Sequence, residues 1–124
     1  MLIRTDPASD APLYDQIAAS VRAETAAGRL APGDRLPSAR DVAEALDVNL
    51  HTVLRAYQAL RDEGLVEMRR GRGAIITERA AAYEHLSDEV AALMARAREL
   101  GLEVDAVVAL LRAHDPGSPG DTST

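Results

Sequence analysis

Hydrophobic and polar residues alternate along most of this chain with the spacing of amphipathic helices. Leu13, Ile17 and Val21 recur at every fourth position and share one face of a predicted helix over residues 11–27. Gly28 ends this helix, because glycine readily adopts the backbone conformation that closes a helical segment.

Two capping signals mark the starts of the next helices. Ser38 followed by Asp41 is a variant of the capping box, in which the serine side chain accepts a bond from an early backbone N–H and the acid returns one. A second helix is therefore expected over residues 39–46. Asn49 is suited to cap a third helix over residues 50–63.

The turn between these two helices is short. Asp47 occupies a position where a left-handed backbone is often required, and aspartate tolerates it better than a branched residue. In the third helix Val53, Tyr57 and Leu60 share an apolar face, and Gly64 ends the helix. This is the pattern of a helix-turn-helix, although any three-helix bundle can contain it.

An arginine-rich hairpin is expected next. Residues 65–68 and 74–77 are short β-compatible segments. Residues 29–37, rich in proline and glycine, predict a loop with at most a short strand around Arg35 and Leu36. Glycines at the hairpin tip permit positive φ and let the backbone approach a groove or phosphate closely. The tip consists of Arg69, Arg70, Gly71, Arg72 and Gly73.

From Glu78 onward apolar residues recur at spacings of three and four, as in a helical seam of about three heptads. Gly101 breaks this helix, and a shorter one is expected over residues 103–113. Residues 115–124 are rich in Pro, Gly, Ser and Thr and predict a disordered tail. The seam and its continuation on the last helix comprise Tyr83, Leu86, Val90, Leu93, Ala97, Leu100, Val107 and Leu111.

This seam has two interpretations. It pairs two copies of the chain, or it packs within one chain on the last helix, and both can hold because two helices expose more apolar surface than one pair can bury. We favour the first interpretation, a homodimer. Two helix-turn-helix units related by a two-fold axis can contact two half-sites of a DNA duplex about 34 Å apart.

Together these elements predict a mainly α fold. Residues 1–77 are expected to form a winged helix-turn-helix of three helices plus a β-hairpin wing, residues 78–114 a two-helix dimerisation domain, and residues 115–124 a disordered tail.

Composition narrows the function. The chain lacks cysteine, which excludes disulfides, thiolate metal sites and a cysteine nucleophile, and all of its 14 basic residues are arginine. The absent lysine excludes Schiff-base chemistry and a Walker-type phosphate lysine. His51, His85 and His114 lie far apart without metal-ligand spacing, so no enzyme activity, metal or cofactor is expected. Without a signal peptide or an apolar run of about 18 residues, the cytoplasm and no membrane partner are expected.

The net charge of −6 argues against tight non-specific DNA binding, but it is unevenly distributed. Up to Thr77, ten arginines face eleven acids, and after it four arginines face nine. The predicted DNA-binding part is therefore close to neutral. A local basic patch matters more than the sum, because charges beyond roughly 10 Å are largely screened.

The exposed start of the third helix has side chains suited to base edges, since Asn can pair with adenine and Arg with guanine or phosphate. Each has a plainer interpretation as a solvated surface residue, and the hairpin arginines could simply keep an exposed loop soluble. The expected DNA-binding residues are Ser38, Arg40, Asn49, His51, Thr52, Arg55, Arg69, Arg70, Gly71, Arg72 and Gly73.

An ordered series of segments resembles the GntR family of bacterial transcription regulators, and the short helical tail resembles its YtrA-like subgroup. The resemblance covers about residues 12–77. Its segments are PLYDQI (12–17), GRLAPGDRLPSAR (28–40), NLHTV (49–53), RAY (55–57), EGLV (63–66) and GRG (71–73).

This resemblance implies a winged-helix head that binds a palindromic operator, usually as a repressor, with membrane-transporter genes often among the targets. Leu50 stands where many members have Arg or Pro, and Leu54 stands where some have Arg, so the base preferences of other members do not transfer to this chain. The pyridoxal-binding MocR-like branch is excluded by the chain's length and its missing lysine. The alternative is a winged-helix protein-interaction module without specific DNA readout, while an unidentified small-molecule effector is compatible with the regulator.

Overall fold

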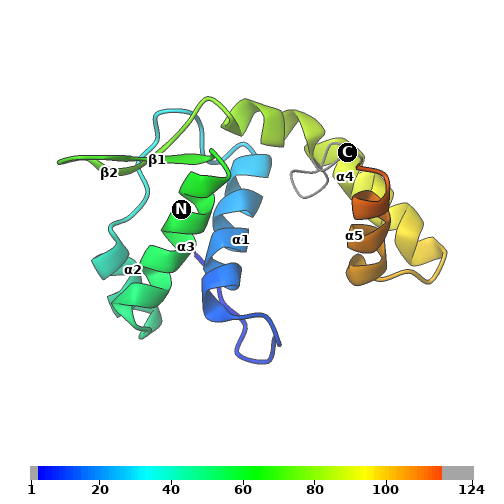
Figure 1. The fold of residues 1–124 in the computed structure, drawn as a ribbon, viewed down its shortest axis with the longest axis horizontal. Coiled ribbons are helices and arrows are strands. Elements are labelled where there is room, and N and C mark those ends of the chain that lie inside the picture. The colour runs from blue at the N-terminus through cyan, green and yellow to red at the C-terminus, as the bar shows by residue number, and fades with distance from the viewer. Residues whose placement is uncertain (1–2, 116–124) are drawn as a thin grey trace, which may run out of the picture. The chain divides into compact units, whose positions relative to one another are not determined.

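The computed structural model describes residues 3–115 of the chain as three helices, a β-hairpin and two further helices (Figure 1). The predicted mainly α class is confirmed. Apart from Asp115, the predicted tail lies outside the described residues. The elements are α1 (Leu13–Ala26), α2 (Ala39–Leu46), α3 (Leu50–Asp62), β1 (Val66–Arg69), β2 (Gly73–Ile76), α4 (Ala80–Glu99) and α5 (Val104–Ala113).

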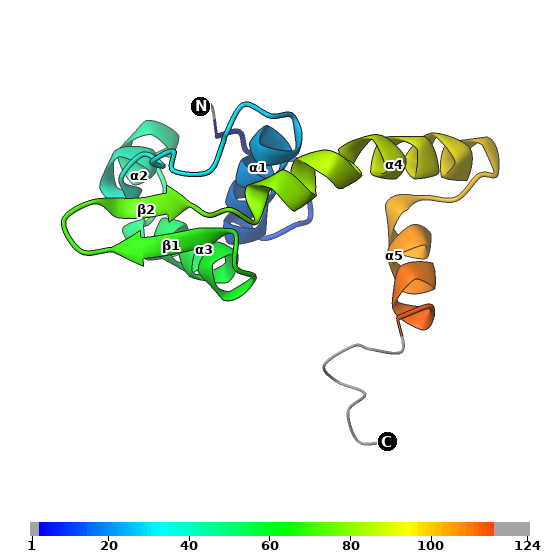
Figure 2. The same ribbon diagram turned by 90° about the horizontal axis from the view of Figure 1, so that it is seen from above.

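The helix α3 is central to the packing, because it contacts α1, α2 and β1 (Figure 2). Its inner face, formed by Val53, Ala56, Tyr57 and Leu60, is buried. The Tyr57 hydroxyl donates a 2.7 Å hydrogen bond to the Pro37 carbonyl, and burial raises the pKa of Tyr57 to about 12. The rest of this core comprises Ile17, Ala18, Val21, Leu30, Leu36, Val42, Ala43, Leu65, Val66, Ala74, Ile76 and Ala80.

The predicted helix starts and the turn between them are confirmed. The Ser38 side chain accepts a 3.0 Å hydrogen bond from the Asp41 N–H, although the described residues contain no return bond from Asp41. Asp47 ends α2 with a left-handed backbone, φ 55 and ψ 51. The Asn49 side chain accepts a 2.8 Å hydrogen bond from the His51 N–H and so caps α3.

The hairpin pairs antiparallel from Val66 opposite Ile76 to Arg69 opposite Gly73. Each strand lies one residue nearer the tip than the sequence pattern predicts. At the base of the hairpin the Leu65 N–H donates to the Leu60 carbonyl in the last turn of α3, so Leu65 contributes only its carbonyl, which accepts from the Thr77 N–H at 2.9 Å.

A third segment joins the hairpin, as the pattern around Arg35 and Leu36 predicts. Arg35 forms an isolated antiparallel bridge with Ile75. The Leu36 N–H then donates to the Ala74 carbonyl at 2.9 Å. The loop between α1 and α2 is therefore fixed along the edge of β2.

Contacts divide the chain into two compact units, one ending at Ser87 and the other beginning at Asp88. The domain limit expected at residue 77 stays a prediction, and the division between the two compact units falls inside α4. The first turns of α4 belong to the first unit because Ala80 is part of its core and Tyr83 packs against that core. We call this first unit the head.

The second unit contains the later turns of α4 and the whole of α5. Ala97 and Val107 are its buried apolar residues. Gly101, with φ 76, ends α4, and the Leu102 N–H donates to the Ala97 carbonyl at 2.8 Å. No helix among residues 3–115 combines the length and hydropathy needed to cross a bilayer.

Three polar side chains connect three helices of the head, and we call them the clamp: Arg22 of α1, Glu63 at the end of α3 and Tyr83 of α4. The Arg22 Nε lies 3.1 Å from both Glu63 carboxylate oxygens, and its Nη2 lies 2.7 Å from Oε1. The Tyr83 hydroxyl donates to Glu63 Oε2. Burial alone raises the pKa of Glu63, but the hydrogen bonds from Arg22 and Tyr83 outweigh it and lower that pKa. Burial and the bond to Glu63 raise the pKa of Tyr83 to about 12.

The clamp makes the free energy of unfolding depend on pH in the acidic range. Because the pKa of Glu63 is lower in the folded chain, its ionised form stabilises the fold above the unfolded pKa of about 4.3. That contribution is lost as the pH falls through the lower folded value. We expect Glu63→Gln to cost about 1 kcal/mol at neutral pH, allowing for the partial exposure of the ion pair, and the difference from wild type to shrink below about pH 4.

Thermal unfolding followed by circular dichroism across this pH range measures that difference. The matched control is Glu44→Gln, because Glu44 is exposed and has no ion pair among residues 3–115. A difference for Glu63→Gln that stays constant down to about pH 3 would contradict the expected linkage.

Candidate nucleic-acid interface

The start of α3 presents polar side chains outward. Asn49, His51 and Arg55 are exposed and Thr52 is half-buried, whereas Val53 on the same helix is completely buried. This division follows from the helical period, which turns one face toward the core and the other to solvent. With Arg40, these four polar residues form what we call the recognition surface.

The Asn49 side-chain amide caps α3 and is also exposed to solvent. Its oxygen accepts from the His51 N–H at 2.8 Å, which fixes the amide at the helix start. The bidentate pairing with adenine expected from the sequence needs that same oxygen together with the NH2 group. The free NH2 group is therefore the part of Asn49 best placed for a new contact.

Arg55 is held by an aromatic ring. Its guanidinium carbon lies 3.9 Å from the ring centroid of Tyr14, which is half-buried on α1. Such stacking restricts a long flexible side chain without removing its charge or its hydrogen-bond donors. Sequence analysis missed Tyr14 as a site residue, although an aromatic residue in the first turn of α1 was a signal in a chain with only three tyrosines.

Arg40 and Ser38 have different roles at the start of α2. The Ser38 hydroxyl is already bonded to the Asp41 N–H as a helix cap. Arg40 is exposed and has no salt bridge among residues 3–115. It borders a shallow hollow of about 520 Å³, which also reaches Leu50 at the start of α3. Arg40 is therefore a cation adjoining the exposed turn of α3.

The arginines of the hairpin tip lie on a tight turn that contains two glycines. Gly71 and Gly73 have φ values of 77 and 78, which residues with side chains rarely adopt. A Cβ at either glycine would meet no atom within 4 Å, so the backbone conformation rather than crowding requires glycine. Arg69 forms a 3.1 Å ion pair with Glu67, whereas Arg70 and Arg72 are exposed without one among the described residues.

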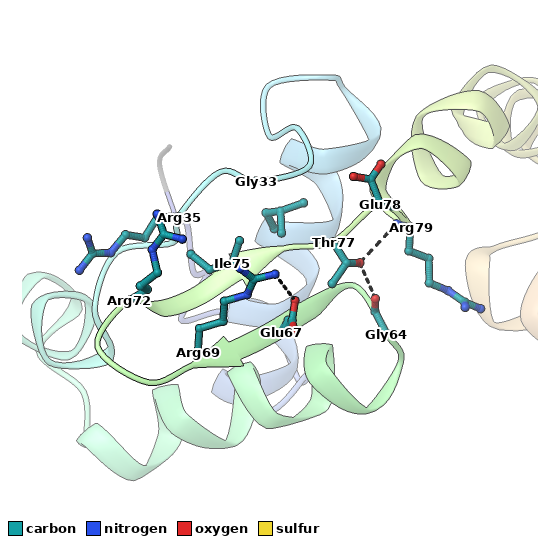
Figure 3. Close-up of a pocket in the computed structure, with 11 residues that line it drawn as sticks. Gly33, Arg35, Gly64, Glu67, Arg69, Arg72, Ile75, Thr77, Glu78 and Arg79 are labelled. Carbon is teal, nitrogen blue, oxygen red and sulfur yellow. Dashed lines mark hydrogen bonds and ion pairs between the residues drawn. The ribbon is translucent and has the colours of Figure 1, made fainter.

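One face of the hairpin borders a groove of about 950 Å³, and Figure 3 displays its lining. Arg35, from the bridged segment before α2, lies on this groove together with Arg72 from the tip. Four arginines and two glutamates line it, so its local charge is positive in a chain of net charge −6. The lining residues are Gly33, Arg35, Gly64, Glu67, Arg69, Arg72, Ile75, Ile76, Thr77, Glu78 and Arg79.

Arg35 is a candidate residue that sequence analysis missed. The available signal was its alternation with Leu36, because neighbouring residues of an extended segment point to opposite faces. Leu36 is buried and Arg35 is exposed, as that alternation requires. Its position beside the wing depends on the bridge to Ile75, which no local pattern specifies.

The structure divides the predicted dimer residues into two groups. Tyr83 packs on the head, and Ala97 and Val107 are buried within one chain. The remaining predicted residues are exposed, and other large apolar side chains of α4 and α5 accompany them. The exposed set, which we call the apolar stripe, comprises Leu86, Val90, Leu93, Leu100, Val104, Val108, Leu110 and Leu111.

Within residues 3–115 no group of three or more His, Asp or Glu side chains is arranged to hold a metal ion. The exposed polar and arginine side chains of this surface supply hydrogen-bond donors and positive charge.

Known proteins resemble this chain in sequence and fold. A family model described as bacterial regulatory proteins, gntR family, matches residues 13–76. The HTH-type transcriptional repressor YtrA of Bacillus subtilis (strain 168) is 42% identical over 79 residues, which span 64% of this chain and 61% of that protein. The HTH-type transcriptional regulator YhcF of the same organism is 36% identical over 99 residues, spanning 76% of this chain and 82% of that protein. The solved structure of YtrA from Sulfolobus acidocaldarius, a GntR-family transcription factor, matches with 34% identity and a TM-score of 0.59, covering 80% of this chain and 99% of that one.

Two substitutions at Asn49 separate helix capping from any contact with a partner. Asn49→Ala removes the cap and should cost about 1 kcal/mol of unfolding free energy, whereas Asn49→Ser retains a capping oxygen and should cost less than about 0.5 kcal/mol. If the Asn49 NH2 group also contacts DNA, Asn49→Ser should weaken DNA binding without this loss of stability. Urea denaturation and fluorescence anisotropy with labelled duplex DNA measure the two effects. An equal loss of stability in both variants would contradict the capping role.

Proposed function

The chain belongs to the gntR family of bacterial regulatory proteins, and we propose that it represses transcription as a homodimer bound to a palindromic operator. The observation that carries the proposal is the recognition surface, where one face of α3 is buried and its first turn is polar and exposed. A helix of this kind fits the major groove, which is wide enough to admit it.

The wing supports the proposal through its charge. Arg70 and Arg72 extend from a tight turn, and Arg35 lines the same groove as Arg72. Arginine bonds phosphate oxygens with a planar fork of donors, and narrow minor grooves attract it. In this proposal the wing contacts the backbone or minor groove adjacent to the groove that α3 enters.

The apolar stripe supports the homodimer. Eight large apolar side chains of α4 and α5 are exposed, which is costly for a chain that remains monomeric. A two-fold dimer would cover the same stripe on both copies and present two heads to the two halves of a palindrome. Repression is inferred by similarity to the repressor YtrA of B. subtilis.

Selection of bound duplexes from a random pool tests DNA recognition directly. We expect Arg40→Ala to lose about 1 to 3 kcal/mol of binding free energy on the selected sequence and to relax preference at one or two positions. If Arg70→Ala removes a phosphate contact, it should weaken binding to all DNA sequences equally. The slope of log affinity against log salt concentration should then fall in magnitude by about one.

Arg61→Ala is the matched control, because Arg61 is an exposed arginine near the end of α3 whose ion pair is with the adjacent Asp62. It should leave both affinity and sequence preference unchanged. Unaltered affinity and preference in Arg40→Ala would refute the base-reading role of Arg40. Absent or salt-insensitive binding by the wild-type chain would instead favour a protein-interaction module.

A substitution in the apolar stripe tests the proposed homodimer. We expect the wild-type chain to be a dimer at micromolar concentration and Leu93→Asp to shift it to monomer, because the buried carboxylate would lack a partner. Leu13→Asp is the control, since Leu13 is 39% exposed, close to the 43% of Leu93, but lies at the start of α1. Size-exclusion chromatography with light scattering gives the masses. A monomeric wild-type chain, or a dimeric Leu93→Asp variant, would contradict the proposed interface.

A further inference from the structure

The Arg55 side chain connects the recognition surface on α3 with the first turn of α1. Arg55 lies one helical turn beyond His51 and Thr52, so the three side chains share a face of α3 that is turned away from the buried face. The Arg55 guanidinium carbon lies 3.9 Å from the ring centroid of Tyr14. The helices α1 and α3 lie side by side within the head (Figure 1), and this pair joins them at the edge of the recognition surface.

The Tyr14 ring is a fixed support for this cation. Tyr14 is half-buried and packs against the core of the head, and Ile17 and Ala18 in the next turn of α1 are completely buried. A ring packed in this way has few orientations open to it, whereas an exposed arginine without a partner samples many rotamers. Contact with the ring therefore limits the directions in which Arg55 extends.

The aromatic partner leaves the charge and the donors of Arg55 available. Four other arginines of the head pair with carboxylates, which neutralise their charge and occupy some of their N–H groups. These are Arg22, Arg29, Arg61 and Arg69. A cation–π contact adds no negative charge and requires no N–H···O bond. Arg55 has no ion pair among residues 3–115, so it is a restrained cation whose donors can bind an outside anion.

We propose that Tyr14 is a positioning residue that holds Arg55 for contact with a phosphate of the DNA backbone on the α1 side of the recognition surface. This inference rests on the proposed operator binding. The first turn of a recognition helix reaches base edges, whereas Arg55 lies in the second turn of α3 and is drawn toward α1. Phosphate contacts fix the orientation of a protein on the duplex. In this role the Tyr14–Arg55 pair sets how α3 lies in the major groove, and Tyr14 itself contacts no DNA.

Substitutions of the full-length chain test the two members of the pair separately. Without the ring, Arg55 must become ordered when DNA binds, so Tyr14→Leu should weaken binding to the selected duplex about fivefold. Tyr14→Phe retains the aromatic face and should stay within about twofold of wild type. Arg55→Ala should weaken binding to all duplexes equally and lower the magnitude of the slope of log affinity against log salt concentration by about one. Fluorescence anisotropy with labelled duplexes measures each affinity.

A double-mutant cycle separates positioning from a general effect on the fold. If Tyr14 acts through Arg55, Tyr14→Leu should cost less than about twofold when Arg55 is already alanine. If Tyr14 only stabilises the head, its substitution should cost the same with and without Arg55. Arg40→Ala provides the matched control background, because Arg40 is another exposed arginine of the recognition surface but lies at the start of α2. The full loss from Tyr14→Leu should persist in that background.

Each part of the proposal has a result that would overturn it. Equal losses from Tyr14→Leu in the wild-type and Arg55→Ala backgrounds would refute positioning, and a loss from Tyr14→Phe as large as that from Tyr14→Leu would assign the effect to the hydroxyl instead. Altered preference at one base pair in Arg55→Ala, with an unchanged salt slope, would refute the phosphate contact.

A measurement on the DNA-free chain distinguishes failure of this inference from failure of the proposed function. Ring-current shifts of the Arg55 side-chain protons should be present in wild type and Tyr14→Phe and absent in Tyr14→Leu. Their absence in wild type would refute the contact between Tyr14 and Arg55. A wild-type chain that has these shifts but binds no selected duplex would overturn the proposed function itself.

Discussion

The burial of one face of α3 against α1 and α2 is the constraint on which the rest of the head depends. The chain has no Phe or Trp, so an aliphatic core forms around a single fully buried aromatic residue, Tyr57. Its ring fills the core while its hydroxyl binds the Pro37 carbonyl, which fixes the loop leading into α2. Once that face is buried, the opposite face of the first turn of α3 must point to solvent. Exposure of Asn49 and His51 is thus a consequence of packing.

Local signals predicted most of the fold, and contacts between distant residues account for what they missed. The bounds of α2 and the left-handed Asp47 followed from neighbours within one or two turns, where capping and backbone preference operate. The clamp joins Arg22 to Glu63 across 41 positions and Tyr83 to Glu63 across 20. The charge of these side chains and the hydrophobic period of their helices predict that they are exposed or half-buried. Neither property predicts which of them contact one another. Arg35 beside the wing and Tyr14 beneath Arg55 escaped prediction for the same reason.

The acidic balance of the chain is compatible with a basic surface because many carboxylates are already paired. In the head, Glu24, Asp62, Glu63 and Glu67 each lie within ion-pair distance of an arginine. The arginines that border the wing and the recognition surface without such a pair among residues 3–115 are Arg35, Arg40, Arg55, Arg70 and Arg72. At physiological salt the field of distant acids is screened within about 8 Å, so a phosphate near these side chains experiences mainly the cations.

In the proposed homodimer, a head with so few unpaired arginines would gain affinity chiefly by being linked to a second head. Linking converts the second binding event into an intramolecular one, and the gain is largest when the connection spans the two sites without strain. A flexible connection would give a modest gain at many separations, whereas a rigid one gives a large gain at few. Sequence preference in the proposed dimer would then depend on the spacing of the two half-sites as well as on the bases that α3 contacts.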